Sequence, residues 1–460
     1  MTIDVQATDL AADDRPLRAL ILGANGELGG RKMKASYDFG TNTGTEFVGA
    51  DIVDESQFKP IFSNFSGYHN LTRQRDRDKL IELARGRRFD FIYDASWPDG
   101  HLLNVLNCEV LAQHIVVTKP FVSIEQAATL GAFMESAAFQ SLRGRLLMHD
   151  HYINKPAMMA MLKALPKAHN RYARFARIMI FITEQRTVNH PQELKRWRAL
   201  LGGIVPDLVS HALMIIQLLT REGLVWTGQE GITFKRFRRT IQPTACVRAQ
   251  MRGAALPQDV DTACVVEYKV TEELGIVDEA GASEGVTFTN TFFVLVVCGK
   301  GLKVTDHADR DLKAMEIAFQ GQGSSTGILD LETNCVNELL ETAGVAVPAK
   351  QRIHRGINYP IMAILKNWPQ FENGDQLRTD LFQDMEVTWE NVRLLAVTRN
   401  RCKGGLLPAY DPGEEIHKFV NTHIGPANGF EYFGKEGSGW PMKEPPLHLM
   451  RGRPVSSSIA

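Results

Sequence analysis

The most constraining feature of the chain is a regular alternation of short apolar runs with longer helical patterns over about residues 17–150. Runs of four to six apolar residues suit buried strands, and the segments between them have the period of amphipathic helices. Parallel strands need long crossover connections, whereas antiparallel strands do not. The alternation therefore predicts a parallel sheet with crossover helices.

The pattern changes in the second half of the chain. Long strands without helices between them predict an antiparallel sheet, and they are expected at 231–241, 261–270, 285–298 and 312–320. Helices are expected at 328–343 and 376–398, and surface coil from about residue 402. The predicted architecture is a flexible tail at 1–16, a Rossmann-type α/β domain at 17–155, and a larger α+β domain with a mostly antiparallel sheet at 156–460.

Charge and composition exclude several classes of protein. Lys and Arg total 52 against 53 Asp and Glu, which argues against a nucleic-acid or anionic-membrane partner. No stretch approaches the roughly 20 apolar residues of a membrane span, and the acidic start of the chain lacks the apolar core of a signal peptide. The six cysteines show no paired spacing, so we expect thiols in a reducing, cytoplasmic setting.

A glycine turn follows the first predicted strand and precedes a helix. Gly23, Gly26 and Gly29 have GxxGxxG spacing, which lets a backbone and a helix N-terminus approach a pyrophosphate. The alternative is a tight structural turn. The residues assigned to a dinucleotide cofactor are Gly23, Asn25, Gly26, Glu27 and Leu28 of the turn, together with Asp51, Ser96 and Lys119.

Asp51 bears on the choice between NAD and NADP. It ends the second predicted strand, where an acid suits the free ribose hydroxyls of NAD and repels the extra phosphate of NADP. A solvated strand-end carboxylate is the alternative. Because Arg31 and Lys32 follow the turn and would suit a phosphate, NAD is favoured without excluding NADP.

Polar residues also interrupt apolar segments farther along the chain. Lys119 ends a strand, and His149-Asp150-His151-Tyr152 with Lys155 forms a cation-rich segment after another. His211 lies in an apolar helix four residues after Asp207, so the two would share one face, and a carboxylate would orient the His as a base. A hydrogen-bonded core histidine is the alternative. No metal site is expected, because HDH at 149–151 lacks further ligands at useful spacing.

Six segments, in the same order, resemble the glucose-6-phosphate dehydrogenase family. They are LGANGELGGRK, VTKPF, DHYINK, ITEQR, CGKGL and TDLFQDMEVTW, of which DHYINK is the most specific. The resemblance implies that His211 is the base, Asp150 orients it, and Lys119 touches substrate and cofactor beside Pro120. It also implies substrate contacts from His151, Tyr152 and Lys155 to a sugar phosphate, and from Glu184, Asp207 and Lys300 to the rest of the substrate.

The sequence departs from the glucose-6-phosphate dehydrogenase pattern at several positions. The resemblance places these positions around the sugar of the substrate and not around its phosphate. The spacing of four between Asp207 and His211, with the Lys-Pro segment, also resembles the glucose–fructose oxidoreductase and inositol dehydrogenase family. The loop after Glu184 differs from the family pattern, Thr305 stands where a second cation is expected, and an acidic insertion covers 270–285.

The leading hypothesis is an NAD(P)-dependent dehydrogenase that oxidises the anomeric carbon of a phosphorylated hexose, most simply glucose 6-phosphate, to a lactone. The alternative enzyme oxidises a secondary hydroxyl of a sugar, sugar phosphate or cyclitol. A third reading is a catalytically silent cofactor-binding regulator. The resemblance further implies a homodimer or homotetramer built on the second sheet.

Overall fold

The structure is a computed structural model of the chain. It describes residues 15–26, 28–53, 65–155, 158–159, 174–184, 203–221, 233–251, 263–277, 283–298, 313–320, 326–330 and 355–407. Glu27, Lys300 and Thr305 lie outside the described residues, as does most of the expected tail at 1–16 and of the expected helix at 328–343. Glu184 is described only as the last residue of a strand.

The chain divides into two compact units. Unit 1 comprises Met1–Asn154 and Gln351–Val392, and unit 2 comprises Lys155–Lys350 and Arg393–Ala460. The first division, after residue 154, falls close to the expected boundary at 155. The return of residues 351–392 to unit 1 differs from the expectation, which assigned all of 156–460 to the second domain.

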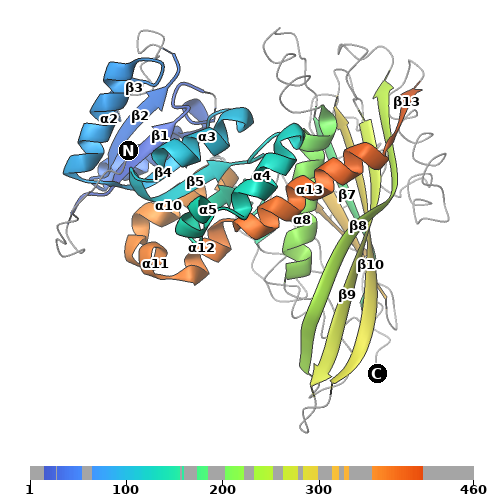
Figure 1. Cartoon of the computed structure of the whole chain (residues 1–460). Helices are drawn as coiled ribbons and strands as arrows, with labels where there is room; N and C mark the ends of the chain where they lie inside the picture. Colours follow the sequence, from blue (N-terminus) through green and yellow to red (C-terminus); the bar gives the residue numbers. More distant parts are fainter. Residues whose placement is uncertain are drawn as a thin grey trace. The chain divides into compact units, whose positions relative to one another are not determined.

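Unit 1 contains a sheet of six parallel strands, as predicted (Figure 1). The strands are β1 (Arg18–Leu22), β2 (Glu46–Asp51), β3 (Phe65–Asn70), β4 (Phe89–Asp94), β5 (Ala112–Thr118) and β6 (Leu146–His149). Their order is β3-β2-β1-β4-β5-β6, the doubly wound order of dinucleotide-binding domains. Strand β3 was not predicted, because its sequence, FSGYHN, is half polar and its first residues are only partly buried.

Helices connect successive strands and also return from the far end of the sequence. The connecting helices are α1 (Lys34–Asn42), α2 (Gln74–Gly86), α3 (Pro98–Cys108), α4 (Ala127–Met134) and α5 (Ala137–Leu142). The returning helices are α10 (Arg355–Lys366), α11 (Trp368–Asn373), α12 (Asp375–Leu381) and the first part of α13 (Met385–Arg401). Instead of one helix over 376–398, the chain breaks between α12 and α13, where Gln383 and Met148 exchange two backbone hydrogen bonds of 2.9 Å.

Packing and hydrogen bonds explain why the returning segment belongs to unit 1. The hydroxyl of Ser36 donates to Asn358 Oδ1 at 2.8 Å, and the amide of Asn358 donates to the carbonyl of Lys32 at 2.9 Å. Ile361 and Trp368 lie in the same buried apolar cluster as residues of β1, β2 and β4. Burial of this apolar surface, at about 25 cal/mol per Å², outweighs the entropic cost of the long connection.

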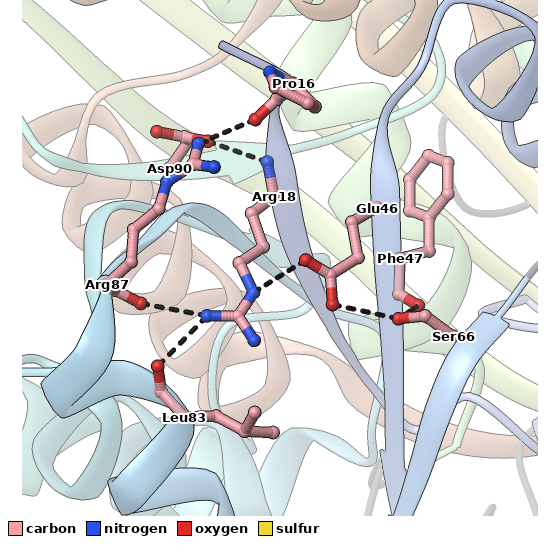
Figure 2. A network of polar contacts seen from close by, with 8 residues as sticks. All are labelled: Pro16, Arg18, Glu46, Phe47, Ser66, Leu83, Arg87 and Asp90. Carbon is pink, nitrogen blue, oxygen red and sulfur yellow. Dashed lines mark hydrogen bonds and ion pairs between the residues drawn. The ribbon is translucent and has the colours of Figure 1, made fainter.

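A polar network joins the amino ends of β1, β2 and β4 (Figure 2). The buried guanidinium of Arg18 donates to the carbonyls of Leu83 at 3.0 Å and Arg87 at 3.1 Å. Its Nε lies 3.0 Å from Glu46, which accepts a 3.0 Å hydrogen bond from Ser66. Arg18 thereby adds a side-chain donor to carbonyls at the end of α2, where the Leu83 carbonyl also accepts the N–H of Arg87 at 3.3 Å.

The buried carboxylate of Asp90 is the second centre of this network. It accepts the backbone N–H of Arg18 at 2.7 Å and side-chain donors from Arg87 at 2.9 Å and Arg15 at 3.1 Å. Burial raises the pKa of Asp90, while these donors act in the opposite direction. Arg15 was expected in the flexible tail, but this contact ties it to β4.

Unit 2 contains a seven-stranded, mostly antiparallel sheet, as predicted. Its order is β12 (Thr326–Asp330), β11 (Lys313–Gln320), β7 (Arg174–Glu184), β10 (Ser283–Cys298), β9 (Ala263–Val277), β8 (Thr233–Met251) and β13 (Lys403–Leu407). Within this sheet, β7/β10 and β8/β13 are the only parallel pairs among the described strands. The helix expected from 328 and the coil expected from 402 are wrong where β12 and β13 form, because edge pairing with β11 and β8 decides their structure.

The acidic segment at 270–285 lengthens a hairpin of this sheet. Its described residues continue β9 to Val277 and start β10 at Ser283, with Val277 opposite Ser283. Figure 1 shows β8, β9 and β10 running together as long curved strands. The described residues of the insertion therefore extend the sheet.

A disulfide between Cys246 and Cys402 joins β8 to the residue before β13, across a sequence separation of 156 residues. The expectation that the cysteines are all thiols is wrong for this pair, since a pairing so distant in sequence leaves no spacing signal. Cys108 and Cys264 are free cysteines, and burial raises the pKa of Cys108 to about 12. Among the described residues, none of the helices has the length and apolar character required to span a membrane.

The network at Arg18 gives a stability prediction. We expect Arg18→Met to lower the free energy of unfolding by about 2–3 kcal/mol, because it removes a donor from two partly buried carbonyls and leaves Glu46 without its ion pair. The matched control is Arg85→Met, whose exposed pair with Glu82 contributes at most about 0.5 kcal/mol. Urea denaturation measures both, and equal losses in the two variants would contradict the structural role of Arg18.

Candidate functional site

The predicted residues of unit 1 lie at one edge of its sheet. The carboxyl ends of parallel strands meet at the same edge, where α/β proteins bind ligands. The strand ends place there the Gly23 turn after β1, Asp51 on β2, Ser96 after β4, Lys119 after β5, and Asp150 after β6. The prediction that these residues share one edge follows from the confirmed parallel sheet.

Gly23 lies in the turn after β1, beside the loop after β4. The connections that follow these two strands run in opposite directions along the sheet. Its φ is +70°, which favours glycine, and a Cβ there would lie 2.7 Å from the backbone nitrogen of Ser96. Ala95 donates its N–H to the carbonyl of Leu22 at 3.0 Å, so β1 and the loop after β4 remain in contact past the sheet. The structure thus brings the predicted residues Gly23 and Ser96 together.

Asp51 faces the glycine turn. Its carboxylate accepts the backbone N–H of Asn25 at 2.8 Å and that of Ile52 at 2.7 Å. A carboxylate has about four acceptor sites, so two backbone donors leave capacity for hydroxyl groups. Asp51 therefore stabilises the turn and is still suited to a ribose.

The loop around Ser96 contains two polar residues that the sequence did not reveal as part of the site. The buried carboxylate of Asp94 accepts the N–H of Ser96 at 2.9 Å and the amide of Asn104 at 3.0 Å. Asn104 also donates to the hydroxyl of Ser96 at 2.9 Å. The available signal was an acid at the end of the apolar run FDFIYD, which a buried strand holds only when it is hydrogen-bonded.

Backbone contacts hold Lys119 and Asp150 at neighbouring strand ends. Lys119 precedes a cis peptide bond to Pro120, and its N–H donates to the carbonyl of His149 at 3.1 Å. Asp150 is buried, and its carboxylate accepts the N–H of Tyr152 at 2.9 Å. The side chain of Lys119 is half-buried.

His149, directly before Asp150, is a neutral structural histidine. Its Nε2 lies 2.9 Å from the carbonyl of Gly356, so Nε2 carries the proton, and Nδ1 accepts from the hydroxyl of Tyr93 at 2.9 Å. Burial lowers the pKa of His149, against the contributions of the Gly356 hydrogen bond and Asp150. The end of β6 is thereby fixed to β4 and to α10.

The remaining residues expected to hold a phosphate differ in exposure. His151 is half-buried, and its ring centroid lies 4.7 Å from that of the fully buried Tyr152. Lys155 is 9% exposed and belongs to unit 2. Their role in binding a phosphate stays a prediction.

In unit 2, Asp207 and His211 lie on an apolar helix that begins with a π-helical turn. The π turn spans Val205–Val209, and α8 continues over Ser210–Arg221. Both side chains are buried, and the hydroxyl of Ser210 donates to the carbonyl of Asp207 at 2.9 Å. The first residue of the expected pair thus stands in a widened turn instead of a regular α-helix, a feature frequent at functional sites.

Comparison with known proteins identifies the fold. No family model and no curated protein sequence matches the chain. The structure is similar to that of myo-inositol 2-dehydrogenase from Lactobacillus plantarum, with a TM-score of 0.53 at 12% identity over 84% of this chain and 97% of that one. It is also similar to a myo-inositol dehydrogenase from Corynebacterium glutamicum, with a TM-score of 0.51 at 13% identity over 84% and 97% of the two chains.

A third similar structure is an inositol dehydrogenase homologue from Azotobacter vinelandii complexed with NAD+, with a TM-score of 0.51 at 14% identity over 85% and 97% of the two chains. The chain therefore has the two-domain fold of these oxidoreductases. The comparisons support the resemblance to the inositol dehydrogenase family at the level of fold, and they do not support the resemblance to glucose-6-phosphate dehydrogenases.

The close approach at Gly23 gives a prediction with a matched control. We expect Gly23→Ala to lower the free energy of unfolding by about 2–4 kcal/mol, because strain at positive φ adds to overlap with the Ser96 backbone. Gly44→Ala has the same strain, with φ of +84° but nothing within 4 Å of the added Cβ, and should lose only about 1 kcal/mol. Thermal unfolding of both variants measures the difference, and equal losses would exclude a packed turn at Gly23.

Proposed function

We propose that the chain is an NAD-dependent dehydrogenase that oxidises a secondary hydroxyl of a sugar or cyclitol to a ketone. The observation that carries the proposal is the packed Gly23 turn at the β1/β4 divergence, within a fold shared with inositol dehydrogenases. The turn admits no side chain at Gly23, because a Cβ there would overlap the Ser96 backbone, and such a tight turn after the first strand of a doubly wound sheet is typical of dinucleotide sites.

The described residues fit a dinucleotide. Gly23, Asn25, Gly26 and Leu28 would hold the pyrophosphate, Asp51 the ribose hydroxyls, and Ser96 would line the same site. Glu27, outside the described residues, is assigned to the same site from the sequence alone. An acid at position 51 favours NAD over NADP, and one of the similar structures is complexed with NAD+. When bound, the nicotinamide supplies the hydride acceptor.

The protein's own residues would position and deprotonate the substrate. His211 is the proposed base, Asp150 the carboxylate that orients it, and Lys119 the cation that contacts substrate and cofactor. Asp207, Glu184 and the loop residues His151, Tyr152 and Lys155 are proposed substrate contacts, with Lys300 as a further one. A base that takes the hydroxyl proton is required because alkoxide character drives hydride departure.

The substrate class follows from the departures in sequence and from the fold. The sequence departs from the glucose-6-phosphate dehydrogenase pattern around the sugar, and the similar structures named above are inositol dehydrogenases and a homologue of one. A secondary hydroxyl of a ring is therefore favoured over the anomeric carbon of glucose 6-phosphate.

A substrate screen tests the reaction. The full chain is incubated with NAD+ or NADP+ and a panel of inositols, free sugars and sugar phosphates including glucose 6-phosphate, and the reduced cofactor is followed. We expect activity with a free sugar or cyclitol, preference for NAD+, and a stable ketone. A lactone that opens to an acid would restore the anomeric alternative. Tight NAD+ binding without turnover of any panel member would instead identify a silent binding protein.

Variants of the proposed base test the mechanism. We expect His211→Ala to lower kcat about 10²- to 10⁴-fold, and Asp150→Asn to lower it with a changed pH profile, while the asparagine oxygen still accepts the Tyr152 N–H. Thr220→Val is the control, since it alters a buried hydroxyl on the same helix that bonds the Ile216 carbonyl. If His211→Ala and Thr220→Val have equal kcat values, His211 is not the base.

A further inference from the structure

Three cysteines from distant parts of the chain lie together in unit 2. Cys246 belongs to β8, Cys264 belongs to β9, and Cys402 stands between α13 and β13. Their three sulfur atoms all lie within 4.8 Å of one another. Cys246 and Cys402 form the disulfide described above, whereas Cys264 is not disulfide-bonded. A disulfide therefore has a third sulfur beside it.

The register of neighbouring strands explains why these side chains meet. In the β8/β9 pair, Cys264 lies opposite Arg248, two residues from Cys246. Because side chains alternate between the faces of a sheet, Cys246 and Cys264 are diagonal neighbours on one face. On the other side of β8, the parallel strand β13 begins with the residue after Cys402 and pairs from Val247 onward. The cluster thus joins three adjacent strands, β9, β8 and β13 (Figure 1).

The last turns of α13 lie against the cluster. The carbonyl oxygen of Thr398 lies 3.8 Å from the sulfur of Cys246 and accepts the N–H of Cys402 at 2.9 Å. The hydroxyls of Thr398 and Tyr268 are hydrogen-bonded to each other at 2.8 Å. Cys264 and Cys402 are buried, whereas Cys246 is half-buried. A small ion can therefore reach the sulfurs from the side of Cys246.

The separation of the sulfurs is close to that of a metal-thiolate site. Sulfur atoms bound to one zinc ion at about 2.3 Å lie about 3.8–4.0 Å apart. The observed limit of 4.8 Å leaves the third sulfur within about 1 Å of this arrangement. Once the disulfide is broken, rotation about the Cα–Cβ bonds of Cys246 and Cys402 lets their sulfurs separate to the same distance. Sulfur ligands select thiophilic ions such as Zn²⁺ or Cu⁺ over Mg²⁺ and Ca²⁺, which prefer oxygen.

The charges around the cluster suit thiolates. Three thiolates and one divalent ion leave one negative charge in excess. Arg248 lies on the same face of the sheet, opposite Cys264, and stabilises such a charge. Arg401, the last residue of α13, donates to the carbonyl of Pro243 on β8 at 2.8 Å. The acid of this part of β9, Glu267, lies an odd number of residues from Cys264 and so on the opposite face.

We propose that Cys246, Cys264 and Cys402 bind one thiophilic metal ion when their disulfide is reduced. A dithiol reductant supplies two electrons and two protons, the bond between Cys246 and Cys402 breaks, and the reductant becomes a disulfide. The three thiols then lose their protons as the sulfur–metal bonds form. The ion takes over the link between β8 and the start of β13 and extends it to β9. This proposal does not rest on the proposed function.

Zinc binding to the reduced full chain tests the site. The chain is reduced with a dithiol, freed of the reductant without air, and titrated with Zn²⁺ against a coloured chelator. We expect one Zn²⁺ per chain with a Kd below about 1 µM, and binding at least about 100-fold weaker in the oxidised chain. Equal affinity of the two forms would overturn the proposal. So would weaker binding by the reduced chain, including the case in which the folded chain resists reduction.

Cys264→Ala separates the metal site from the disulfide. It removes one sulfur but keeps Cys246 and Cys402, so the oxidised variant still forms their disulfide. We expect the reduced variant to bind Zn²⁺ at least about 100-fold more weakly. The matched control is Cys108→Ala, which removes a cysteine of unit 1 and should leave the Kd unchanged. Unchanged affinity in Cys264→Ala would overturn the proposal, and Cys402→Ser gives the same test if that variant fails to fold.

Oxidation should release the ion. Glutathione disulfide accepts two electrons from the thiolates of Cys246 and Cys402, which form their disulfide. It becomes two glutathione thiols by taking up two protons, and the thiolate of Cys264 takes up a third. We expect one Zn²⁺ released for each disulfide formed, and retention of Zn²⁺ by the oxidised chain would overturn the proposal. None of these measurements uses a substrate, so a failed substrate screen would remove the proposed function and leave the metal site standing.

Discussion

The close packing of the Gly23 turn against the Ser96 backbone is the contact on which the carboxyl edge of the first sheet depends. It occurs where β1 and β4 are neighbours and their connections leave in opposite directions. Other links extend from it along the edge: Asp51 holds the turn through Asn25, and His101 joins the Ser96 loop to the loop after β5. The next strand end is then fixed by the Lys119 N–H on the carbonyl of His149. The positions of the candidate residues at this edge are therefore set by contacts to the main chain of its loops.

The two edges of this sheet use charge differently. At the amino edge, the Arg18 guanidinium donates to two carbonyls, and the Asp90 carboxylate accepts the backbone N–H of Arg18. All of these partners belong to the protein, so the network forms without a ligand. At the carboxyl edge, Asp51, Asp94 and Asp150 bind backbone N–H groups of the loops that follow them. The first arrangement contributes to stability, whereas in the second the Asp51 carboxylate keeps acceptor capacity beside the glycine turn.

The sequence predicted the elements whose signals are local and missed those that distant contacts create. Five of the six strands of unit 1, the glycine turn and the apolar helix around His211 are visible as apolar periods and turn residues. The return of residues 351–392 to unit 1 is not visible in the sequence, because its hydrogen bonds, such as that from Ser36 to Asn358, join residues 322 positions apart. Similarly, β12 and β13 form at sheet edges, where the partner strand outweighs weak local preference.

The aspartates at the strand ends show why the sequence could predict the candidate site only in part. Asp51 accepts the N–H of the next residue, and Asp94 and Asp150 each accept the N–H two residues on. This is the turn-forming behaviour typical of aspartate, and it explains an acid at a strand end without any ligand. A sequence pattern cannot separate that role from ribose or base-orienting roles, since all three require a carboxylate at the same place. These roles are distinguished by the hydrogen-bond acceptor capacity that a carboxylate retains once it has bound the N–H groups of its loop. Asp94 binds a side-chain donor, Asn104, as well as a loop N–H, whereas Asp51 binds the backbone N–H groups of Asn25 and Ile52. The Asp51 carboxylate, held against the glycine turn by these N–H groups, therefore lies where the proposed function requires an acceptor for a ribose.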